Sequence, residues 1–527
     1  MTAYGIDLGT TYSCIARVDE TGRPTVLRSL EGTDTVPSVV FFESADNVVV
    51  GAAAKDGSVL EPGLAVSLIK REMAHGTLYR RHGRTYTPEE ISAFILRKLA
   101  EDARVATGET VRDVVITVPA CFGAAERDAT RKAGEIAGLT VVDVVSEPVA
   151  AAITYGLLTP GRDRTVLVYD LGGGTFDTTV ITLRGGNIEV VCTDGHDELG
   201  GADWDERLME HLVEEFTLEH PDVDSPLEDQ QAEQQLRVDA EALKRTLSSR
   251  NRHVVRVAHE GRVARVEFTR ETFEELTRDL LDRTVEITRR TMRTAEAKGV
   301  RDYDQFVLVG GSTKMPAVAE ALRRAFGVPV LIQDPDLAVA KGAALYAFEE
   351  TYRRLLRSGD HAGAEAVAAR AGLTTVQRER VKDRTISTVA SRAFGIVISG
   401  EPGETLHVLH LVHANDPLPA SVTEEFYTVV PDQTVVDVEV VEQAGSAESP
   451  RLDDNARIAG GQLPIPPGKP KGWPIEVTFD LDSSGLLHVT ARERETGEHL
   501  DLRVQIGGMS EEEVAVSRTE LSRVRIG

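Results

Sequence analysis

One short pattern occurs twice in the chain, and it limits the possible folds more than any other feature. Residues 5–11 read GIDLGTT and residues 169–177 read YDLGGGTFD. Each copy places an aspartate at the end of an apolar strand, followed by glycines and a threonine. Glycine-rich turns of this kind present successive backbone N–H groups to phosphate oxygens. Two facing copies could therefore hold a polyphosphate from both sides.

The two aspartates of the repeat, Asp7 and Asp170, are the candidates for a magnesium site. Mg²⁺ keeps most of its waters, so we expect these carboxylates to act mostly through water. A single Asp-Leu-Gly would be typical of a hairpin turn, whereas two copies after strands favour a ligand site. A third glycine turn, 310–312, follows the apolar strand 306–309; taken alone, it is typical of an ordinary strand-to-helix turn.

Length and charge restrict the function classes. A chain of 527 residues is too long for one core, which predicts two or three domains. The net charge of −26 repels phosphate backbones, so we expect no nucleic-acid binding. No basic N-terminal stretch precedes an apolar run, and no segment reaches the roughly 18 apolar residues of a membrane span, which predicts a cytoplasmic protein without membrane contact.

The three cysteines, Cys14, Cys121 and Cys192, are too few and scattered for a disulfide or metal framework. They are predicted to be reduced core residues.

Residues 1–350 alternate β-branched runs with helical periodicity, which predicts an α/β domain. A buried strand is expected over Val114–Val118. The sequence Thr87-Pro88-Glu89-Glu90 is typical of a helix start, with an N-cap, a proline in the first turn and a capping-box glutamate. The longest helix is expected over Glu271–Lys298.

The sequence pattern changes after about residue 350, from alternating strands and helices to mainly strands. Residues 351–387, helical and then polar, are predicted to form a linker, and residues 388–507 a compact all-β domain. Val436, Val438 and Val440 share one face of their strand. Residues 508–527 are charged and helix-prone. The strands are predicted over Phe394–Ile398, Thr405–Leu411, Val422–Val429, Thr434–Val441, Ile475–Leu481, Leu486–Arg492 and Leu500–Ile506.

Eight sequence blocks, in order, resemble signatures of the DnaK-like heat shock protein 70 chaperone family. They read GIDLGTTYS, ITVPA, EPVAAAITYG, YDLGGGTFD, LGGADWD, EALKRTLSS, VLVGGSTKMP and DPDLAVAKGAA. The resemblance implies a multidomain protein: an actin-like (ribonuclease H-like, duplicated) ATPase domain with a nucleotide cleft, then a β-sandwich substrate-binding domain. The run FDLDSSGLLHVTARERETGE resembles the end of that sandwich, and 508–527 resembles the truncated start of the family's helical lid.

The resemblance also implies roles for individual residues, with ATP and Mg²⁺ as the ligands. Three of the implied nucleoside-side residues, Glu241, Lys244 and Ser248, have the spacing of one helical face, which alone would be typical of a solvated surface. The implied cofactor-binding set is Gly9, Thr10, Thr11, Tyr12, Gly172, Gly173, Gly174, Thr175, Gly200, Gly201, Glu241, Lys244, Arg245, Ser248, Gly310, Gly311, Ser312, Lys314 and Asp336.

The implied catalytic set is Lys70, Glu147, Asp170, Thr175 and Asp7. Lys70 matches the lysine that the family directs at the attacking water and γ-phosphate, where it would stabilise developing charge. Glu147 would order water and metal. Pro119 and Arg127 match a family relay between nucleotide state and substrate domain.

The chain departs from the family pattern at several positions. Lys314 replaces an arginine that stacks on adenine, which predicts weaker nucleotide binding. Segment 74–88 is shorter than usual, and the polar run 384–388 replaces an apolar linker, which weakens the case for domain docking. Ser399 replaces a larger apolar residue that arches over the peptide, and without a full lid we expect bound peptide to leave quickly. The family's peptide groove matches Ile396, Phe426, Val436 and Val438, which could equally be plain sandwich core.

The leading hypothesis is an ATP-hydrolysing chaperone that binds apolar segments of unfolded polypeptides, with a J-domain co-chaperone and a nucleotide exchange factor as possible partners. A small-molecule kinase of the actin-like superfamily is an alternative, although no separate carboxylate base for a substrate hydroxyl stands out. A module that holds nucleotide with little turnover is the third reading, suggested by Lys314 and the polar linker.

Overall fold

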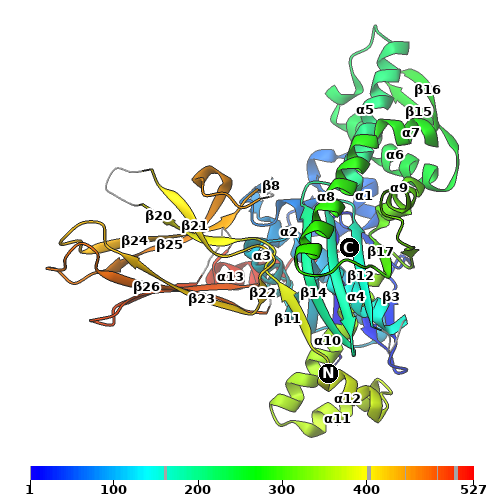
Figure 1. Ribbon diagram of the computed structural model, residues 1–527. Helices are drawn as coiled ribbons and strands as arrows, with labels where there is room; N and C mark the ends of the chain where they lie inside the picture. Colours follow the sequence, from blue (N-terminus) through cyan, green and yellow to red (C-terminus); the bar gives the residue numbers. More distant parts are fainter. Residues whose placement is uncertain (1, 159–162, 400–404, 446, 484, 504–508) are drawn as a thin grey trace.

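The computed structural model describes residues 2–158, 163–399, 405–445, 447–483, 485–503 and 509–527. Figure 1 shows a mixed α/β part and, projecting from one side of it, an all-β part made of long strands. This mixture agrees with the expectation from the sequence. In the described residues, no helix is long and apolar enough to cross a membrane.

A six-stranded sheet lies at the centre of the first lobe. Its strands run in the order β11-β10-β1-β2-β3, and β4 pairs with β2. The pairs β11–β10 and β10–β1 are parallel, and β1–β2 and β2–β3 are antiparallel. The strands are β1 (Tyr4–Asp7), β2 (Tyr12–Val18), β3 (Pro24–Leu27), β4 (Val36–Pro37), β10 (Asp113–Val118) and β11 (Thr140–Ser146).

A seven-stranded sheet forms the second lobe, in the order β18-β17-β12-β13-β14-β19-β22. Its first five strands repeat the first sheet position for position, with two parallel pairs followed by two antiparallel pairs. The sequence repeat therefore reflects a repeated topology. The strands are β12 (Arg164–Leu171), β13 (Phe176–Arg184), β14 (Asn187–His196), β17 (Gln305–Val309), β18 (Val330–Ile332), β19 (Ile386–Val389) and β22 (Pro417–Leu418).

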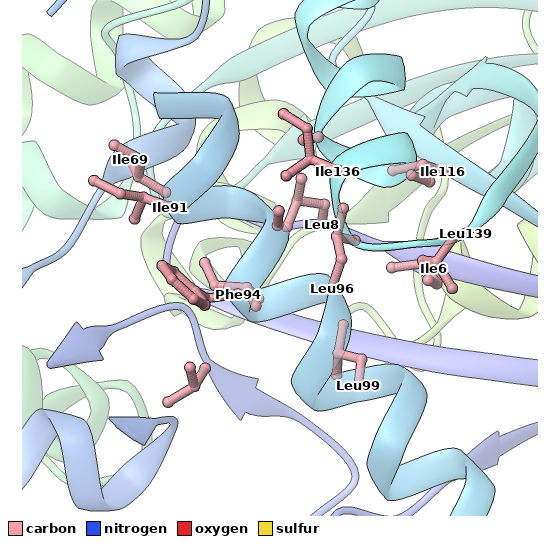
Figure 2. Packing of buried hydrophobic residues seen from close by; sticks show 14 of the residues in the cluster. Ile6, Leu8, Ile69, Ile91, Phe94, Leu96, Leu99, Ile116, Ile136 and Leu139 are labelled. Carbon is pink, nitrogen blue, oxygen red and sulfur yellow. The ribbon is translucent and has the colours of Figure 1, made fainter. Parts of the chain in front are cut away.

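Helices separate and cover the two sheets. Helices α4 (Glu147–Leu158) and α10 (Ala338–Arg357) share one apolar cluster with strands of both sheets, and they pack so closely that a Cβ on Gly342 would lie 1.7 Å from the Ala150 carbonyl oxygen. Helices α2 (Pro88–Thr107) and α3 (Ala124–Ile136) pack on the first sheet, where Figure 2 shows Ile91, Phe94 and Leu96 close to Leu8. The predicted start of α2 is confirmed, because Thr87 and Glu90 form a reciprocal capping box.

The second lobe carries the other helices of the α/β part: α5 (Gly201–Glu219), α6 (Gln230–Ser249), α7 (Arg270–Leu276), α8 (Arg278–Ala297) and α9 (Pro316–Phe326). The prediction of one long helix over Glu271–Lys298 is wrong. At Thr277 the backbone leaves helical geometry (φ −115°, ψ 13°), so the segment divides into α7 and α8. Phe273 of α7 and Ile287 of α8 both lie in the core of the second lobe.

Smaller elements complete the α/β part. A four-stranded sheet in the order β29-β6-β5-β7 is accompanied by α1, and two hairpins, β8–β9 and β15–β16, stand outside the main sheets. The bounds are β5 (Val40–Ser44), β6 (Asn47–Val50), β7 (Ala65–Val66), β8 (Tyr79–Arg81), β9 (Arg84–Tyr86), β15 (Arg252–His259), β16 (Arg262–Thr269), β29 (Arg525–Ile526) and α1 (Ala52–Leu60).

The all-β part consists of two four-stranded sheets, β21-β20-β24-β25 and β23-β26-β27-β28, which share one apolar core. The predicted strands are confirmed to within a few residues, although 504–506 lie outside the described residues. Strand β25 was not predicted. The bounds are β20 (Phe394–Ile398), β21 (His407–Val412), β23 (Ala420–Tyr427), β24 (Val435–Gln443), β25 (Asn455–Pro464), β26 (Pro474–Leu481), β27 (Leu487–Glu493) and β28 (His499–Arg503).

The segments around the all-β part make close contacts with the α/β part. Residues of the predicted linker form α11 (His361–Arg370) and α12 (Thr375–Asp383), and β19 then pairs in parallel with β14. Near the C-terminal end, α13 (Glu511–Leu521) packs with the first lobe, where Leu521 is fully buried, and β29 pairs with β6. Cys14 and Cys192 are buried free thiols as predicted, whereas Cys121 is only half-buried.

Candidate functional site

A cavity of about 270 Å³ lies between the two lobes, and most of the predicted site residues line it. The third glycine turn and helix α6 complete its wall. The predicted residues in the lining are Asp7, Gly9, Thr10, Thr11, Tyr12, Lys70, Glu147, Asp170, Gly172, Gly173, Thr175, Glu241, Lys244, Arg245, Ser248, Gly310, Gly311, Ser312, Lys314 and Asp336.

The first glycine turn joins β1 to β2. Its shape is fixed by side chains beneath it: the Gly9 N–H donates to Ser13 Oγ (3.1 Å), and the Ser38 hydroxyl donates to the Gly9 carbonyl (2.7 Å). Thr10 is buried and Thr11 is half-buried. The backbone of this turn is therefore held in place before any ligand arrives.

The second turn joins β12 to β13 in the corresponding position. The Gly172 N–H donates to the Thr175 carbonyl (3.1 Å), which closes the turn. A Cβ atom on Gly173 would lie 2.2 Å from Thr11 Oγ1, and one on Gly174 would lie 2.4 Å from Thr10 Cγ2. Real Cβ atoms do not approach so closely, so only glycine lets the two turns meet in this way.

The N-terminus of α5 lies against the second turn. The Gly201 and Ala202 N–H groups donate to the Gly172 and Gly173 carbonyls (2.9 and 2.8 Å). A Cβ on Gly200 would lie 2.5 Å from the Gly174 nitrogen. Gly174, Gly200 and Gly201 thus support the turn from outside the cavity lining.

Burial of acidic groups is the main electrostatic feature of the cavity. Burial, reinforced by the nearby Glu147 carboxylate, raises the pKa of Asp7 to about 7, and burial also raises the pKa of Asp170 well above its usual range. Ionised carboxylates held this close together in a buried site are costly unless a cation joins them. Within the described ranges, no group of three or more His, Cys, Asp or Glu side chains is arranged to hold a metal ion directly.

Lys70 is the buried cation of this cluster. Its ammonium group donates to Glu147 Oε1, and the side chain of Lys70 is 4% exposed. Burial alone would lower the pKa of Lys70, but the Glu147 and Asp7 carboxylates outweigh it and raise that pKa. Lys70 therefore stays charged and points toward the acidic centre between the two turns.

Helix α6 supplies the far wall of the cavity. The Lys244 ammonium group donates to the Gly201 carbonyl (2.6 Å) and to Asp205 Oδ2 (2.7 Å). The Ser248 hydroxyl donates to the Lys244 carbonyl within the helix. The predicted common face of Glu241, Lys244 and Ser248 is confirmed, since all three face the cavity.

Tyr12 connects the first lobe to α6. Its hydroxyl donates to Glu241 Oε1 (2.8 Å) and accepts from Arg245 Nη1 (3.0 Å), and the Arg245 guanidinium lies 5.5 Å from the centre of the ring. Lys55 of α1 forms an ion pair with Glu241. These contacts cross the opening between the lobes.

The third glycine turn follows β17. Gly310 has a φ of +83°, and a Cβ there would lie 2.3 Å from the Leu171 carbonyl oxygen, so both conformation and space require glycine. The Ser312 hydroxyl donates to the Gly172 carbonyl (2.8 Å). Lys314, which stands where a stacking arginine was expected, forms an ion pair with Asp336 instead.

Sequence reasoning missed Arg71, the neighbour of Lys70. Its Nε donates to the Gly174 carbonyl (2.9 Å) and its Nη2 to Asp203 Oδ2 (2.7 Å), which bridges the first lobe to the second. Thr35, Asp205, Met315, Pro335 and Val339 also line the cavity without having been predicted. Nothing in the local sequence around Arg71 marks a partner more than 100 residues away.

The predicted groove residues of the all-β part lie in or against its apolar core. Ile396 and Val438 are buried in that core, and Phe426 and Val436 pack against it while staying half-buried. Ser399 is half-buried, and the adjoining residues 400–404 lie outside the described residues. A role of these side chains in binding peptide stays a prediction.

Pro119 and Arg127 lie outside the central cavity, near the loop between β10 and α3. Arg127 lines a second cavity, of about 290 Å³, between the two parts of the chain. Its Nε donates to the Phe122 carbonyl (3.1 Å), and burial lowers the pKa of its guanidinium. Pro119 begins the same loop, and its carbonyl accepts from the Phe122 N–H (3.3 Å).

Loop 119–123 is held from two sides. On one side, Asp177 of β13 accepts from the Ala120 and Cys121 N–H groups (2.9 Å each), and burial raises the pKa of Asp177 to about 7. On the other side, the Ser391 hydroxyl of the all-β part donates to the Phe122 carbonyl (2.9 Å). The second glycine turn and the all-β part thus contact the same short loop.

An ion cluster extends this contact. Arg392 lies 3.2 Å from Glu126 and 3.9 Å from Glu442, and Glu442 accepts from the Ala124 N–H (3.1 Å) at the start of α3. Burial raises the pKa of Glu442 to about 7, although Arg392 opposes the shift. This cluster was not predicted from the sequence, because its members come from distant segments.

Comparison with known proteins finds one matching family model and relatives that bear one name. The family model described as "Hsp70 protein" matches residues 3–79, 75–349 and 357–522. Two relatives, both named "Chaperone protein DnaK", come from Thermotoga neapolitana and Thermotoga petrophila. Each is 38% identical over 512 residues, which cover 95% of this chain and 80% of the relative.

Proposed function

The chain belongs to the Hsp70 family, and on that premise we propose that the cavity between its lobes binds ATP and that Lys70 and Glu147 promote its hydrolysis. The chain is a molecular chaperone and an ATPase, as its family and relatives establish. The observation that carries the site assignment is the buried Lys70–Glu147 pair, which lies beside two facing glycine turns.

The two glycine turns bind the phosphates. The backbone N–H group of Gly173 and the hydroxyls of Thr10, Thr11 and Thr175 line the cavity between the lobes and offer donors to phosphate oxygens. The absence of side chains at the glycines lets the phosphate chain approach the backbone closely.

The acidic residues fit a magnesium ion held through water. Asp170 and Glu147 are buried and Asp7 is half-buried, and the raised pKa values of the two aspartates support a cation as the partner that would favour their ionised forms. Magnesium prefers such oxygen donors and keeps most of its waters. When bound, it supplies charge neutralisation at the phosphates.

Lys70 supplies the catalytic charge from the protein side. Phosphoryl transfer depends on positioning and on stabilisation of charge spread over the phosphate oxygens. A buried ammonium group acts strongly there because little water screens it. Glu147 holds the Lys70 ammonium in place and orders the attacking water, and Arg71 fixes the adjacent backbone to the second turn.

The nucleoside lies toward α6 and the third glycine turn. Glu241, Lys244 and Ser248 offer polar groups to the ribose and base, and Arg245 offers a planar guanidinium. Gly310, Gly311 and Ser312 form the opposite wall near Asp336. Because Lys314 is paired with Asp336 and has no planar group, base stacking is weaker at that position.

We assign an actin-like fold to the α/β part, supported by the repeated sheet topology and by the helices between the sheets. The proposed domains are 1–350 for ATP, 351–387 for the linker, 388–507 for the β-sandwich and 508–527 for the start of a lid. The β-sandwich binds extended apolar segments of client polypeptides, with Ile396, Phe426, Val436 and Val438 at or below the groove.

ATP state reaches the sandwich through loop 119–123 and Arg127. This loop contacts Asp177 of β13, two residues after the second turn, on one side and Ser391 of the sandwich on the other. A J-domain co-chaperone and a nucleotide exchange factor would act on this cycle in the cytoplasm. The small-molecule kinase and the nucleotide-holding module are not favoured, because the relatives are chaperones.

Substitution of Lys70 tests the site. Lys70→Ala should lower single-turnover ATP hydrolysis by about 100-fold or more while ATP affinity changes by less than about tenfold, because the ammonium stabilises the transition state more than the bound substrate. The matched control is Lys382→Ala, which removes an exposed lysine of α12. Unchanged turnover in Lys70→Ala would contradict the assignment.

A further inference from the structure

The hairpin β15–β16 has a charge opposite to that of the whole chain. Residues 250–270 contain six arginines and two glutamates, although the chain carries a net charge of −26. Figure 1 shows the hairpin in the lobe formed by α5, α6 and α7, far from the all-β part. The charges of this segment therefore stand apart from the contacts between the two parts of the chain.

One face of the hairpin belongs to the core. Val255, Val257, Ala264, Val266 and Phe268 are buried with the apolar residues of the second lobe. The alternation of a strand then directs the other set of side chains outward. The two strands pair only with each other in the described part of the chain, so the hairpin forms a sheet of its own.

The outward face combines exposed arginines with exposed valines. Arg256 lies directly opposite Arg265 in the register, and both side chains are exposed. Val254 and Val263, on the same face, are 50% and 40% exposed. Like charges placed directly opposite each other destabilise a strand pair, so the two arginines do not stabilise the fold itself.

Among the described residues, Arg256 and Arg265 lack the ion-pair partners that two neighbouring arginines have. Arg252 lies 3.9 Å from Glu267, and Arg262 lies 2.7 Å from Asp222. In contrast, no hydrogen bond or ion pair links Arg256 or Arg265 to any residue within the described ranges. The two guanidinium groups lie side by side, bordered by the valines and by Glu267, which lies opposite Val254 and pairs with Arg252. Carboxylates and small apolar groups would complement this surface.

We propose that this outward face, defined by Val254, Arg256, Val263 and Arg265, is a docking surface for an acidic protein segment in extended conformation. Extended backbone places alternate side chains on one side, which matches the alternation of arginine and valine on the hairpin. Carboxylates of the partner bind the guanidinium pair and remove its repulsion, while apolar residues of the partner cover the two valines. A nucleic acid would leave the exposed Val254 and Val263 uncovered, which disfavours it as the occupant.

Fluorescence anisotropy with short labelled peptides tests the proposal on the full chain. The probe is a peptide of alternating glutamate and valine, and the reference is the matching glutamine–valine peptide. An excess of an unlabelled, uncharged apolar peptide keeps the proposed client groove occupied. The chain should bind the acidic probe at least about tenfold more tightly than the reference, and added salt should weaken that binding.

Reversal of the two arginine charges tests whether the outward face of the hairpin binds the acidic probe. Arg256→Glu combined with Arg265→Glu should remove the preference for the acidic probe and create one for a lysine–valine peptide. The matched control, Arg323→Glu with Arg324→Glu, makes the same charge change on exposed residues of α9 and should retain the preference. ATP turnover and thermal unfolding should match the unaltered chain in both variants, which shows that the fold is intact.

Three results would overturn the proposal. One is equal binding of the acidic and neutral peptides by the unaltered chain. Another is an unchanged preference in the Arg256/Arg265 double variant. The last is tighter binding of a single-stranded RNA or DNA oligonucleotide than of the acidic peptide, lost in the same variant, which would identify a polyphosphate as the occupant.

Discussion

Gly173 shows how one residue determines the geometry of the site. A methyl group there would meet Thr11 Oγ1 at 2.2 Å, so Gly173→Ala must push the two glycine turns apart. Catalysis of phosphoryl transfer depends on positioning, and a displacement of about 1 Å can cost about 100-fold. We therefore expect ATP turnover to fall at least about tenfold, measured at saturating ATP.

Gly156→Ala is the control for this substitution. Gly156 lies in α4, and a Cβ there would have no neighbour within 4 Å. Alanine in a helix is more stable than glycine by roughly 0.5–1 kcal/mol, so turnover should be unchanged and stability slightly increased. Equal turnover in Gly173→Ala and Gly156→Ala would contradict the close approach of the two turns.

Asp7 links ATP binding to pH. Burial raises its pKa from 3.8 to about 7 in the unliganded chain, so Asp7 carries a proton below that pH. A bound cation favours the ionised carboxylate, and binding must therefore release the proton. The affinity for magnesium–ATP should rise between about pH 6 and about pH 8, with release of about half a proton at pH 7 from this group.

Calorimetry in two buffers of different ionisation enthalpy measures this release directly. Other charged groups also act on the Asp7 carboxyl, namely Glu147, Asp170, Lys70 and Asp336. The Asp7→Asn variant is therefore needed to isolate the protons that Asp7 itself releases. That variant should release fewer protons and show a flatter dependence of affinity on pH. Identical proton release in the two proteins would assign the titration to another group.

At the scale of elements, features that depend on neighbouring residues could be predicted from the sequence, whereas contacts between distant segments could not. The capping box of α2 and the glycine turns depend on neighbouring residues, and the sequence predicts them correctly. Strand β25 was missed because Gly460 and Gly461 weaken its strand pattern. A Cβ on Gly461 would lie 3.0 Å from the side chain of Leu500 in β28, so a larger residue there would press on that side chain. Arg71 and Lys55 were missed because their partners lie far along the chain.

The contact between loop 119–123 and the all-β part depends on Arg392. Its removal leaves the buried carboxylate of Glu442 near Glu126 without its ion-pair partner. Loss of one partner from a buried pair costs about 3–5 kcal/mol, so Arg392→Ala should lower the free energy of unfolding by about 3 kcal/mol at pH 8, measured by urea denaturation.

The pH dependence of that loss has a definite sign. Because the pKa of Glu442 is already raised, protonation below about pH 7 removes the uncompensated charge, so the loss in Arg392→Ala should shrink as the pH falls toward 5. The control is Arg457→Ala, which breaks the exposed pair with Glu439 and should cost less than about 1 kcal/mol. Equal losses for the two variants would show that the Arg392 cluster does not hold the parts together.

At the scale of the whole molecule, the two lobes and the all-β part meet through a few short segments. The cavity residues come from both lobes, and β19 joins the seven-stranded sheet immediately before the all-β part begins. The polar run 384–388 weakens the case that ATP binding docks the two domains, and this expectation stays a prediction. Residues 386–389 form strand β19 beside β14, which a polar segment can do because backbone hydrogen bonding does not require apolar side chains.

The central claim is that ATP hydrolysis between the lobes is coupled to client binding in the all-β part. The most direct test is steady-state ATP turnover of the full chain with and without a saturating unfolded apolar peptide. We expect peptide to stimulate turnover and Arg392→Ala to reduce the stimulation while basal turnover remains, because the proposed coupling passes through loop 119–123. Turnover that is the same with and without peptide would contradict it.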